Sequence, residues 1–191
     1  MHESAPTAQQ PQLRMEIAGL AAFLGEPAAS ALPAGYGART FRPGDEAAWV
    51  ALLQTGEFSR WDRERLDLML ANERVQTPPA GAWFVTRDDA LVGAACAQLH
   101  LDPDGVEPEL GWVVVAPEHR GHGLGLVVCK AVLGSIGRLG YDRAYLRTDD
   151  FRLPAIQTYL TLGFAPAHVH ESHPARWAAI RHQLAARRPP A

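Results

Sequence analysis

The sequence predicts a single domain of the α/β class, of the α+β type, built on one mixed sheet flanked by helices. Its length of 191 residues suits one domain with a core of its own. Apolar residues make up 47% and charged residues 20%, which argues against a mainly disordered chain. The expected elements run strand, two helices, three antiparallel strands, helix, strand, helix, strand and terminal helix, without an internal repeat.

Residues 1–35 are expected to form an arm, partly helical, that packs on the domain or on a partner subunit. The arm is rich in Ala, Pro and Gln. Within residues 13–24, one helical face carries Leu13, Ile17, Leu20, Ala21 and Leu24. The domain itself is expected over residues 36–191.

The boundaries of the domain's elements follow from apolar patterning and turn residues. Pro43-Gly44-Asp45 forms a turn in which Asp45 is suited to cap the first helix, and Asp88-Asp89-Ala90 is a hairpin signal. The strands are expected at residues 38–42, 82–87, 91–100, 109–115, 143–147 and 164–169. The helices are expected at residues 46–54, 61–72, 124–139, 153–162 and 175–186.

Charge, cysteine content and hydropathy exclude several classes of protein. A net charge of -3 argues against a general nucleic-acid binder, which needs a basic face. No segment reaches the length of a membrane span, and residues 1–12 do not form a signal peptide, so no membrane partner is expected. Cys96 and Cys129 lie in apolar surroundings at no metal-ligand spacing. We therefore expect buried free thiols and a cytoplasmic protein.

A glycine-rich loop after the strand at residues 109–115 is the most informative motif. It leads into an apolar helix, whose first N–H groups and positive dipole end make an anion site suited to a pyrophosphate. A P-loop is excluded because Lys130 lies in mid-helix, and a dinucleotide fingerprint is excluded because Leu126 stands where the third glycine is required. The pattern that fits is Arg-x-x-Gly-x-Gly at Arg120, Gly123 and Gly125.

This hexapeptide resembles the acetyl-CoA pyrophosphate loop of the GNAT superfamily of N-acetyltransferases. A second match is Tyr-x-x-x-Gly-Phe at Tyr159, Gly163 and Phe164, and the two matches are one helix, one strand and one helix apart. The resemblance covers roughly residues 36–170. It implies a GNAT fold, with a mixed, mostly antiparallel twisted sheet of six to seven strands, and acetyl-CoA as co-substrate with no metal.

The resemblance also implies which residues bind the co-substrate. The backbone that holds the pyrophosphate would be that of Arg120, Gly121, His122, Gly123, Leu124 and Gly125. The strand edge that pairs with the pantetheine amides would be that of Val113, Val114 and Val115. Many relatives have an Asn where this chain has Arg152, which either reaches a phosphate or caps the site.

Two residues are candidates for catalysis. Glu109 aligns with the family's general base, although it is otherwise a strand-end carboxylate that attracts a cationic acceptor, and Glu107 is its weaker rival. Tyr159 would protonate the departing thiolate, the alternative being an aromatic residue packed in the core. A strand N–H near Val114 or Val115 would polarise the acetyl carbonyl.

Two further groups concern the acceptor side. His168, His170 and His173 are expected to rim the acceptor pocket rather than bind zinc, because only Glu171 lies near them as a further ligand. Glu57, Phe58 and Trp61 would suit an amine with an apolar body, unless the two aromatic residues belong to the core. His119 and His122 flank the glycine loop and add charge there unless they are simply exposed.

The sequence therefore predicts an acetyl-CoA-dependent N-acetyltransferase. The acceptor would be a primary amine of a small molecule, peptide or protein, and transfer would be direct because no Cys lies in either motif. The alternatives are a catalytically silent acyl-CoA-binding sensor or scaffold, and a mononucleotide-binding protein. The arm and the terminal helix are candidates for a homodimer contact.

Overall fold

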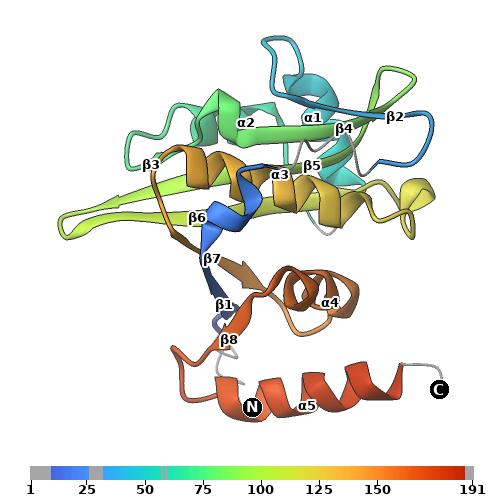
Figure 1. Cartoon of the computed structure of the whole chain (residues 1–191). Coiled ribbons are helices and arrows are strands. Elements are labelled where there is room, and N and C mark those ends of the chain that lie inside the picture. Colours follow the sequence, from blue (N-terminus) through green and yellow to red (C-terminus); the bar gives the residue numbers. More distant parts are fainter. Residues whose placement is uncertain (1–9, 26–31, 57, 59, 188–191) are drawn as a thin grey trace, which may run out of the picture.

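The computed structural model describes residues 10–25, 32–56, 58 and 60–187, and its framework is one mixed sheet (Figure 1). Within the described residues the sheet has eight strands in the order β2-β4-β5-β6-β7-β1-β8, with β3 beside β5. The strands are β1 (Leu13–Ala18), β2 (Tyr36–Thr40), β3 (Val75–Gln76), β4 (Ala82–Arg87), β5 (Ala90–Asp102), β6 (Gly105–Val115), β7 (Arg143–Thr148) and β8 (Ala165–Ala167). Only β6 and β7 pair in parallel, which confirms the mixed, mostly antiparallel sheet.

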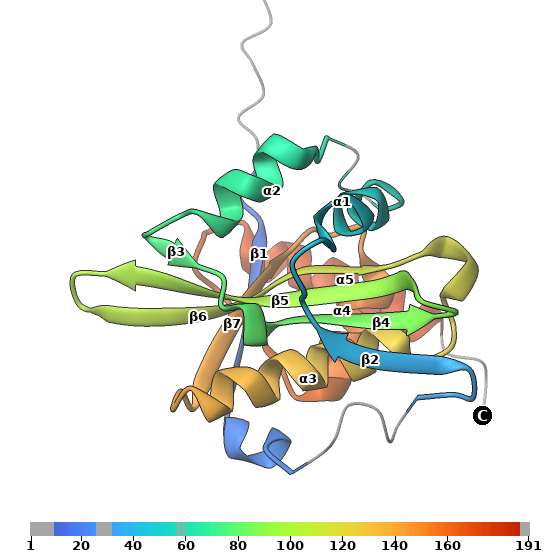
Figure 2. The same cartoon turned by 90° about the horizontal axis from the view of Figure 1, so that it is seen from above.

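Helices cover both faces of this sheet. They are α1 (Glu46–Gln54), α2 (Arg63–Leu70), α3 (Leu124–Arg138), α4 (Leu153–Leu162) and α5 (His173–Ala186), with short 3₁₀ turns η1 (Leu20–Phe23), η3 (Pro79–Gly81) and η4 (Pro117–His119). Figure 2 shows α1 and α2 on one side of β4 and β5 and α3 on the other. In Figure 1, α4 and α5 lie beside β7, β1 and β8. Among the described residues, no helix is long and apolar enough to cross a membrane.

The N-terminal helix expected over residues 13–24 is wrong. Leu13–Ala18 is a strand between β7 and β8, where Met15 lies opposite Leu146 on one side and Pro166 on the other. Leu13, Met15 and Ile17 are buried, so a period of two competes with the helical face. Pairing with two distant strands decides between the two patterns, and only η1 remains helical.

The central opening of the sheet begins where β6 and β7 part. Their one paired position is Glu109 opposite Tyr145, near the middle of both strands. Farther along, Ala94 faces Val114 but Cys96 faces Gly111, so β6 carries one extra residue in a β-bulge. Trp112 in this bulge has φ 52°, an uncommon conformation for a bulky residue. The strands beyond the bulge leave room for a ligand.

Candidate functional site

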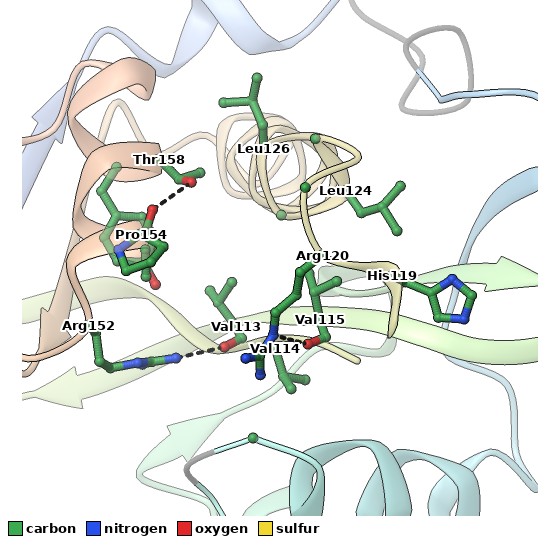
Figure 3. Close-up of a pocket in the computed structure, with 16 residues that line it drawn as sticks. Val113, Val114, Val115, His119, Arg120, Leu124, Leu126, Arg152, Pro154 and Thr158 are labelled. Atoms are coloured by element: carbon green, nitrogen blue, oxygen red, sulfur yellow. Dashed lines mark hydrogen bonds between the residues drawn. The ribbon is translucent and has the colours of Figure 1, made fainter. Parts of the chain in front are cut away.

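The candidate site is a pocket of about 390 Å³ where β6 parts from β7 (Figure 3). Ten of the residues predicted to bind or act line it, namely Val113, Val114, Val115, Arg120, Gly121, Gly123, Leu124, Gly125, Arg152 and Tyr159. His122 and Glu109 do not line it. Residues from β6, the glycine loop, α3 and α4 are thus brought together, as the motif spacing predicts.

The glycine loop adopts the conformation that its composition requires. Gly121 and Gly123 have φ 80° and 74°, in the left-handed region that favours glycine. Gly123 is the N-cap of α3, and its carbonyl accepts the amide N–H groups of Leu126 and Val127 at 3.0 and 3.2 Å. The amide groups of Leu124 and Gly125, which precede these two, have no acceptor within the helix. Together with the helix dipole they form a site suited to an anion.

The edge of β6 presents backbone groups to the opening. The Ala116 amide donates to Val92 O at 2.9 Å, so even-numbered residues bond to β5 and the backbone groups of Val113 and Val115 point the other way. Two arginines bind there: Arg152 Nη2 donates to Val113 O, and Arg120 Nε donates to Val115 O, both at 3.1 Å (Figure 3).

Because backbone groups along β6 face β5 and the opening in turn, they distinguish between the two N–H groups proposed to polarise the acetyl carbonyl. The amide of Val115 faces the opening, whereas that of Val114 faces β5. Of these two neighbouring residues, only Val115 therefore directs a backbone donor toward a ligand at the strand edge.

Tyr159 is packed in the core and also lines the pocket, so it meets both of the descriptions expected of it. Its residue is 2% exposed, and its ring packs edge-on against Phe164 with 6.1 Å between centroids. Yet it also lines the pocket from α4, across the opening from the β6 edge. Core packing thus holds the ring in place at the pocket wall.

Glu109 is buried in a network of polar side chains. It is 4% exposed, which argues against a merely exposed strand-end carboxylate. Its carboxylate accepts Nε and Nη2 of Arg147 at 2.9 and 2.8 Å, and the Tyr145 hydroxyl at 3.2 Å. His100 Nε2 lies 2.6 Å from the same group. These four contacts, from three residues, use the acceptor positions of a carboxylate.

Two partners of Glu109, Tyr145 and Arg147, stay good donors near neutral pH. Burial, with the nearby charge of Glu109, raises the pKa of the Tyr145 phenol, and the hydrogen bond to Glu109 raises the pKa of Arg147.

Glu107, the rival candidate, instead pairs with Arg14 at the exposed end of the sheet. His100, Tyr145 and Arg147 belong to neither sequence motif and were not among the predicted site residues. Residues 145 and 147 are two apart in a strand and therefore share one face of it, which is the sequence signal that could have indicated their common role.

An aromatic cluster lies on the α1 side of β6. Trp112 packs edge-on against Trp61 and Phe58, with 4.3 and 5.3 Å between ring centroids. Arg152 lies over the Phe58 ring at 5.2 Å. Trp61 is buried, so it is a core residue that also forms this wall. Glu57 lies outside the described residues.

The C-terminal histidines differ in their surroundings, although the rings of His170 and His173 lie 5.8 Å apart. His173 is fully buried, with Nδ1 3.2 Å from Ala167 O, whereas exposed His170 has Nδ1 2.9 Å from the Ser172 hydroxyl. No group of three or more metal-ligating side chains is placed to hold an ion in the described part of the chain. Their role at an acceptor pocket, with that of His168, stays a prediction.

The two histidines beside the glycine loop differ. His119 lines the pocket, and its Nδ1 lies 3.0 Å from the Tyr36 hydroxyl. Exposed His122 instead turns its Nδ1 to the Arg120 carbonyl at 3.0 Å. Of the two, His119 is therefore the one placed to contact a ligand in the pocket.

Both cysteines are free and buried, as their apolar surroundings predict. Burial raises the pKa of the Cys129 thiol to about 12 and also raises the pKa of Cys96. A thiol that stays protonated is a poor nucleophile. Neither side chain is suited to carry an acyl group.

Comparisons with known proteins relate the chain to acetyltransferases. The model of the acetyltransferase (GNAT) family matches residues 47–164. Mycothiol acetyltransferase of Thermobispora bispora is 34% identical over 142 residues, which are 70% of this chain and 48% of the relative. That of Thermomonospora curvata is 34% identical over 139 residues, which are 70% of this chain and 45% of the relative. The chain spans about half the length of these relatives.

Solved structures show the same fold. The GCN5-related N-acetyltransferase from Sphaerobacter thermophilus matches with a TM-score of 0.57 and 24% identity, over 83% of this chain and 50% of that one. The ribosomal-protein-S18-alanine N-acetyltransferase from Escherichia coli matches with a TM-score of 0.56 and 19% identity, over 69% of this chain and 79% of that one. Both confirm the fold class expected from the order of elements.

Proposed function

Because the chain belongs to the acetyltransferase (GNAT) family, we propose that it moves the acetyl group of acetyl-CoA directly to a primary amine. The observation that carries this proposal is the single pocket that joins the N-terminus of α3 to the open edge of β6 and to Tyr159. A bound acetyl-CoA would supply the acetyl group as a reactive thioester. The chain's own residues would bind it, orient it and move the protons.

Binding would use backbone groups more than side chains. The amides of residues 121–125 suit the pyrophosphate, with Arg120 as a local positive charge. The backbone groups of Val113 and Val115 suit the two amides of a peptide-like arm. Because Arg152 and Arg120 hold these carbonyls in the structure, both guanidinium groups would have to shift as the arm binds.

Proton movement would involve two places in the site. The Tyr159 hydroxyl would donate a proton to the departing sulfur. The amine proton would pass to Glu109, with His100 exchanging it with solvent, because the side chain of His100 is 21% exposed and that of Glu109 only 6%. The buried thiols support direct transfer over an acyl-enzyme.

The acceptor is proposed only by chemical class. Curated relatives are named for mycothiol, and one structural neighbour is named for an alanine of a ribosomal protein. A primary amine of a small molecule or a peptide is compatible with both. Free buried cysteines support the proposal of a cytoplasmic location. A homodimer contact through the arm at residues 1–35 and α5 stays a prediction.

A panel of amines tests the proposal through release of the CoA thiol. We expect release with at least one amine, and we expect acetyl-CoA to raise the melting temperature. Gly123→Glu should abolish both effects, because it adds a negative charge and a side chain where φ is 74°. Stabilisation by acetyl-CoA without thiol release for any amine would instead indicate a silent binding module.

A further inference from the structure

The two ends of the pocket are marked by two glycines that pack against neighbouring valines of β6. At the phosphate end, a Cβ atom built on Gly125 would lie 3.8 Å from Cγ2 of Val115, an ordinary contact. At the far end, a Cβ built on Gly56 would lie 3.1 Å from Cγ2 of Val114. Both glycines and both valines line the pocket. Gly56 therefore lies closer to its valine than Gly125 does, and leaves no room for a side chain unless Val114 shifts.

The pocket passes from one face of the sheet to the other between these two contacts. Val115 packs against the core under α3, whereas Val114 belongs to the core under α1 and α2. Figure 3 shows the side chain of Val114 on the opposite side of β6 from that of Val115. A ligand held at the N-terminus of α3 would thus emerge on the α1 face beside Gly56.

The orientation of the co-substrate follows from its charge. Its phosphates belong at the N-terminus of α3, where amide N–H groups and the helix dipole favour an anion. Its uncharged thioester end must then lie farther along the β6 edge, where its carbonyl can reach the Val115 amide and the acyl carbons extend toward Val114. The acyl carbons would meet the wall formed by Gly56 and Val114.

This wall cannot easily retreat. The Gly56 amide donates to Leu53 O at 3.1 Å, which fixes the residue to the last turn of α1. Trp112 and Trp61 fill the space on the same face of β6. Val114 itself is only 5% exposed.

We propose that the contact between Gly56 and Val114 sets the length of the acyl group, admitting acetyl and rejecting four-carbon chains. This inference rests on the proposed function, since it needs an acyl-CoA in the pocket. Glycine at position 56 lets the end of α1 approach β6 so closely that Val114 closes the acyl end. Each added methylene should then cost roughly tenfold or more in kcat/KM.

A matched pair of valine variants tests the proposal. Acetyl-, propionyl- and butyryl-CoA are compared by titration calorimetry without amine and by thiol release with one accepted amine. Val114→Ala should bring butyryl-CoA at least about tenfold closer to acetyl-CoA in both measurements. Val115→Ala removes the same atoms at the phosphate end, so it should weaken all three ligands alike and keep their ratios.

A second substitution checks the geometry. Ala at position 56 would place its methyl group in the space that Val114→Ala vacates, and Gly56 has no positive φ that would forbid it. The double variant Gly56→Ala/Val114→Ala should therefore restore the wild-type preference for acetyl-CoA. A thermal melt of each variant shows that the fold is kept.

The outcomes distinguish a failure of the acyl-wall proposal from a failure of the proposed acetyltransferase function. Equal butyryl-to-acetyl ratios in the wild type, Val114→Ala and Val115→Ala would overturn the assignment of the acyl wall, as would a double variant as permissive as Val114→Ala. Absence of thiol release from all three thioesters, with every amine, would instead contradict the proposed function itself.

Discussion

Tyr159 offers the sharpest test at the scale of one residue, because its ring is buried and the residue also lines the pocket. Tyr159→Phe keeps the ring beside Phe164 and removes only the hydroxyl. If that hydroxyl donates a proton to sulfur, kcat should fall by about a hundredfold, within the range for general acids. Steady-state thiol release measures this loss.

The control for this variant is another tyrosine. Tyr141→Phe removes a hydroxyl from a residue that only packs against the edge of the larger core. It should leave kcat within about twofold, since surface changes away from a site have small effects. Equal kcat values for Tyr159→Phe and the wild type would assign Tyr159 to packing alone.

Glu109 and Arg147 form an ion pair, and substitution of either residue should lower stability, but only substitution of Glu109 should lower activity. Either Glu109→Gln or Arg147→Gln breaks the fork of two hydrogen bonds, and each should lower the free energy of unfolding by about 1–2 kcal/mol, because the Arg147 side chain is 49% exposed. Only Glu109→Gln removes the proposed proton acceptor, so it alone should lower kcat by about a hundredfold. Urea unfolding and thiol release measure the two effects.

A similar loss of kcat in both variants would argue that Glu109 serves as the partner of Arg147 and not as a base. The sequence could not separate these roles. The motif register identifies Glu109, but its partners come from β5 and β7, and His100 reaches it diagonally across the sheet. Such contacts depend on strand register, which distant segments decide together.

Among single elements, helix α1 begins where the sequence predicts, but not because of the predicted side-chain cap. The helix begins at Glu46, as the turn at Pro43-Gly44-Asp45 predicts, but the Asp45 side chain does not cap it. Asp45 instead accepts Nη1 and Nη2 of Arg39 at 2.6 and 2.7 Å and the Arg42 amide at 2.7 Å. The carboxylate therefore ties β2 to the start of α1.

The contribution of the Arg39–Asp45 ion pair to stability depends on pH. The hydrogen bond from Arg39 holds the pKa of Asp45 below its usual value, so the folded state binds fewer protons than the unfolded state in acid. The contribution is fully present above about pH 4 and is lost as the pH falls through the lowered pKa. Asp45→Asn should lower the free energy of unfolding by about 1 kcal/mol at pH 7, and by progressively less in acid.

Urea unfolding of both proteins between pH 3 and pH 7 measures that difference. Asp67→Asn is a suitable comparison, because Asp67 pairs with exposed Arg63 on the surface of α2 and should contribute less. A difference for Asp45→Asn that does not shrink in acid would contradict the proposed role of its charge.

The helices were the most predictable elements. Residues 46–54 and 153–162 match exactly, because turn residues and Gly163 mark their ends locally. β3 was missed because two residues carry no pattern, and β1 because its apolar residues fit two periods at once. The glycine loop was predictable for the opposite reason, since its φ values follow from the residue type alone.

At the scale of the whole molecule, β1 joins the two ends of the chain. Met15 is fully buried and lies between Leu146 and Pro166. Met15→Asp would place a carboxylate in the core without a partner, so we expect a loss of about 3 kcal/mol or more in the free energy of unfolding. Glu16→Ala, on the exposed face of the same strand, should cost less than about 1 kcal/mol.

Thermal unfolding followed by circular dichroism compares the two variants. Equal melting temperatures would mean that β1 contributes little to the sheet. Partial unfolding confined to β7, β8 and α5 would instead show that the two halves of the sheet melt separately, which hydrogen exchange can detect.

The place of β1 also fixes the timing of folding. β1 comes first among the described strands along the chain, yet the two strands that flank it come last, with partners as far apart as Arg14 and Ala167. β1 must wait for β7 and β8 before it can pair, while β2 through β6 can already pair among themselves. Contacts this distant in sequence slow folding, so closure around β1 should be the late step of refolding.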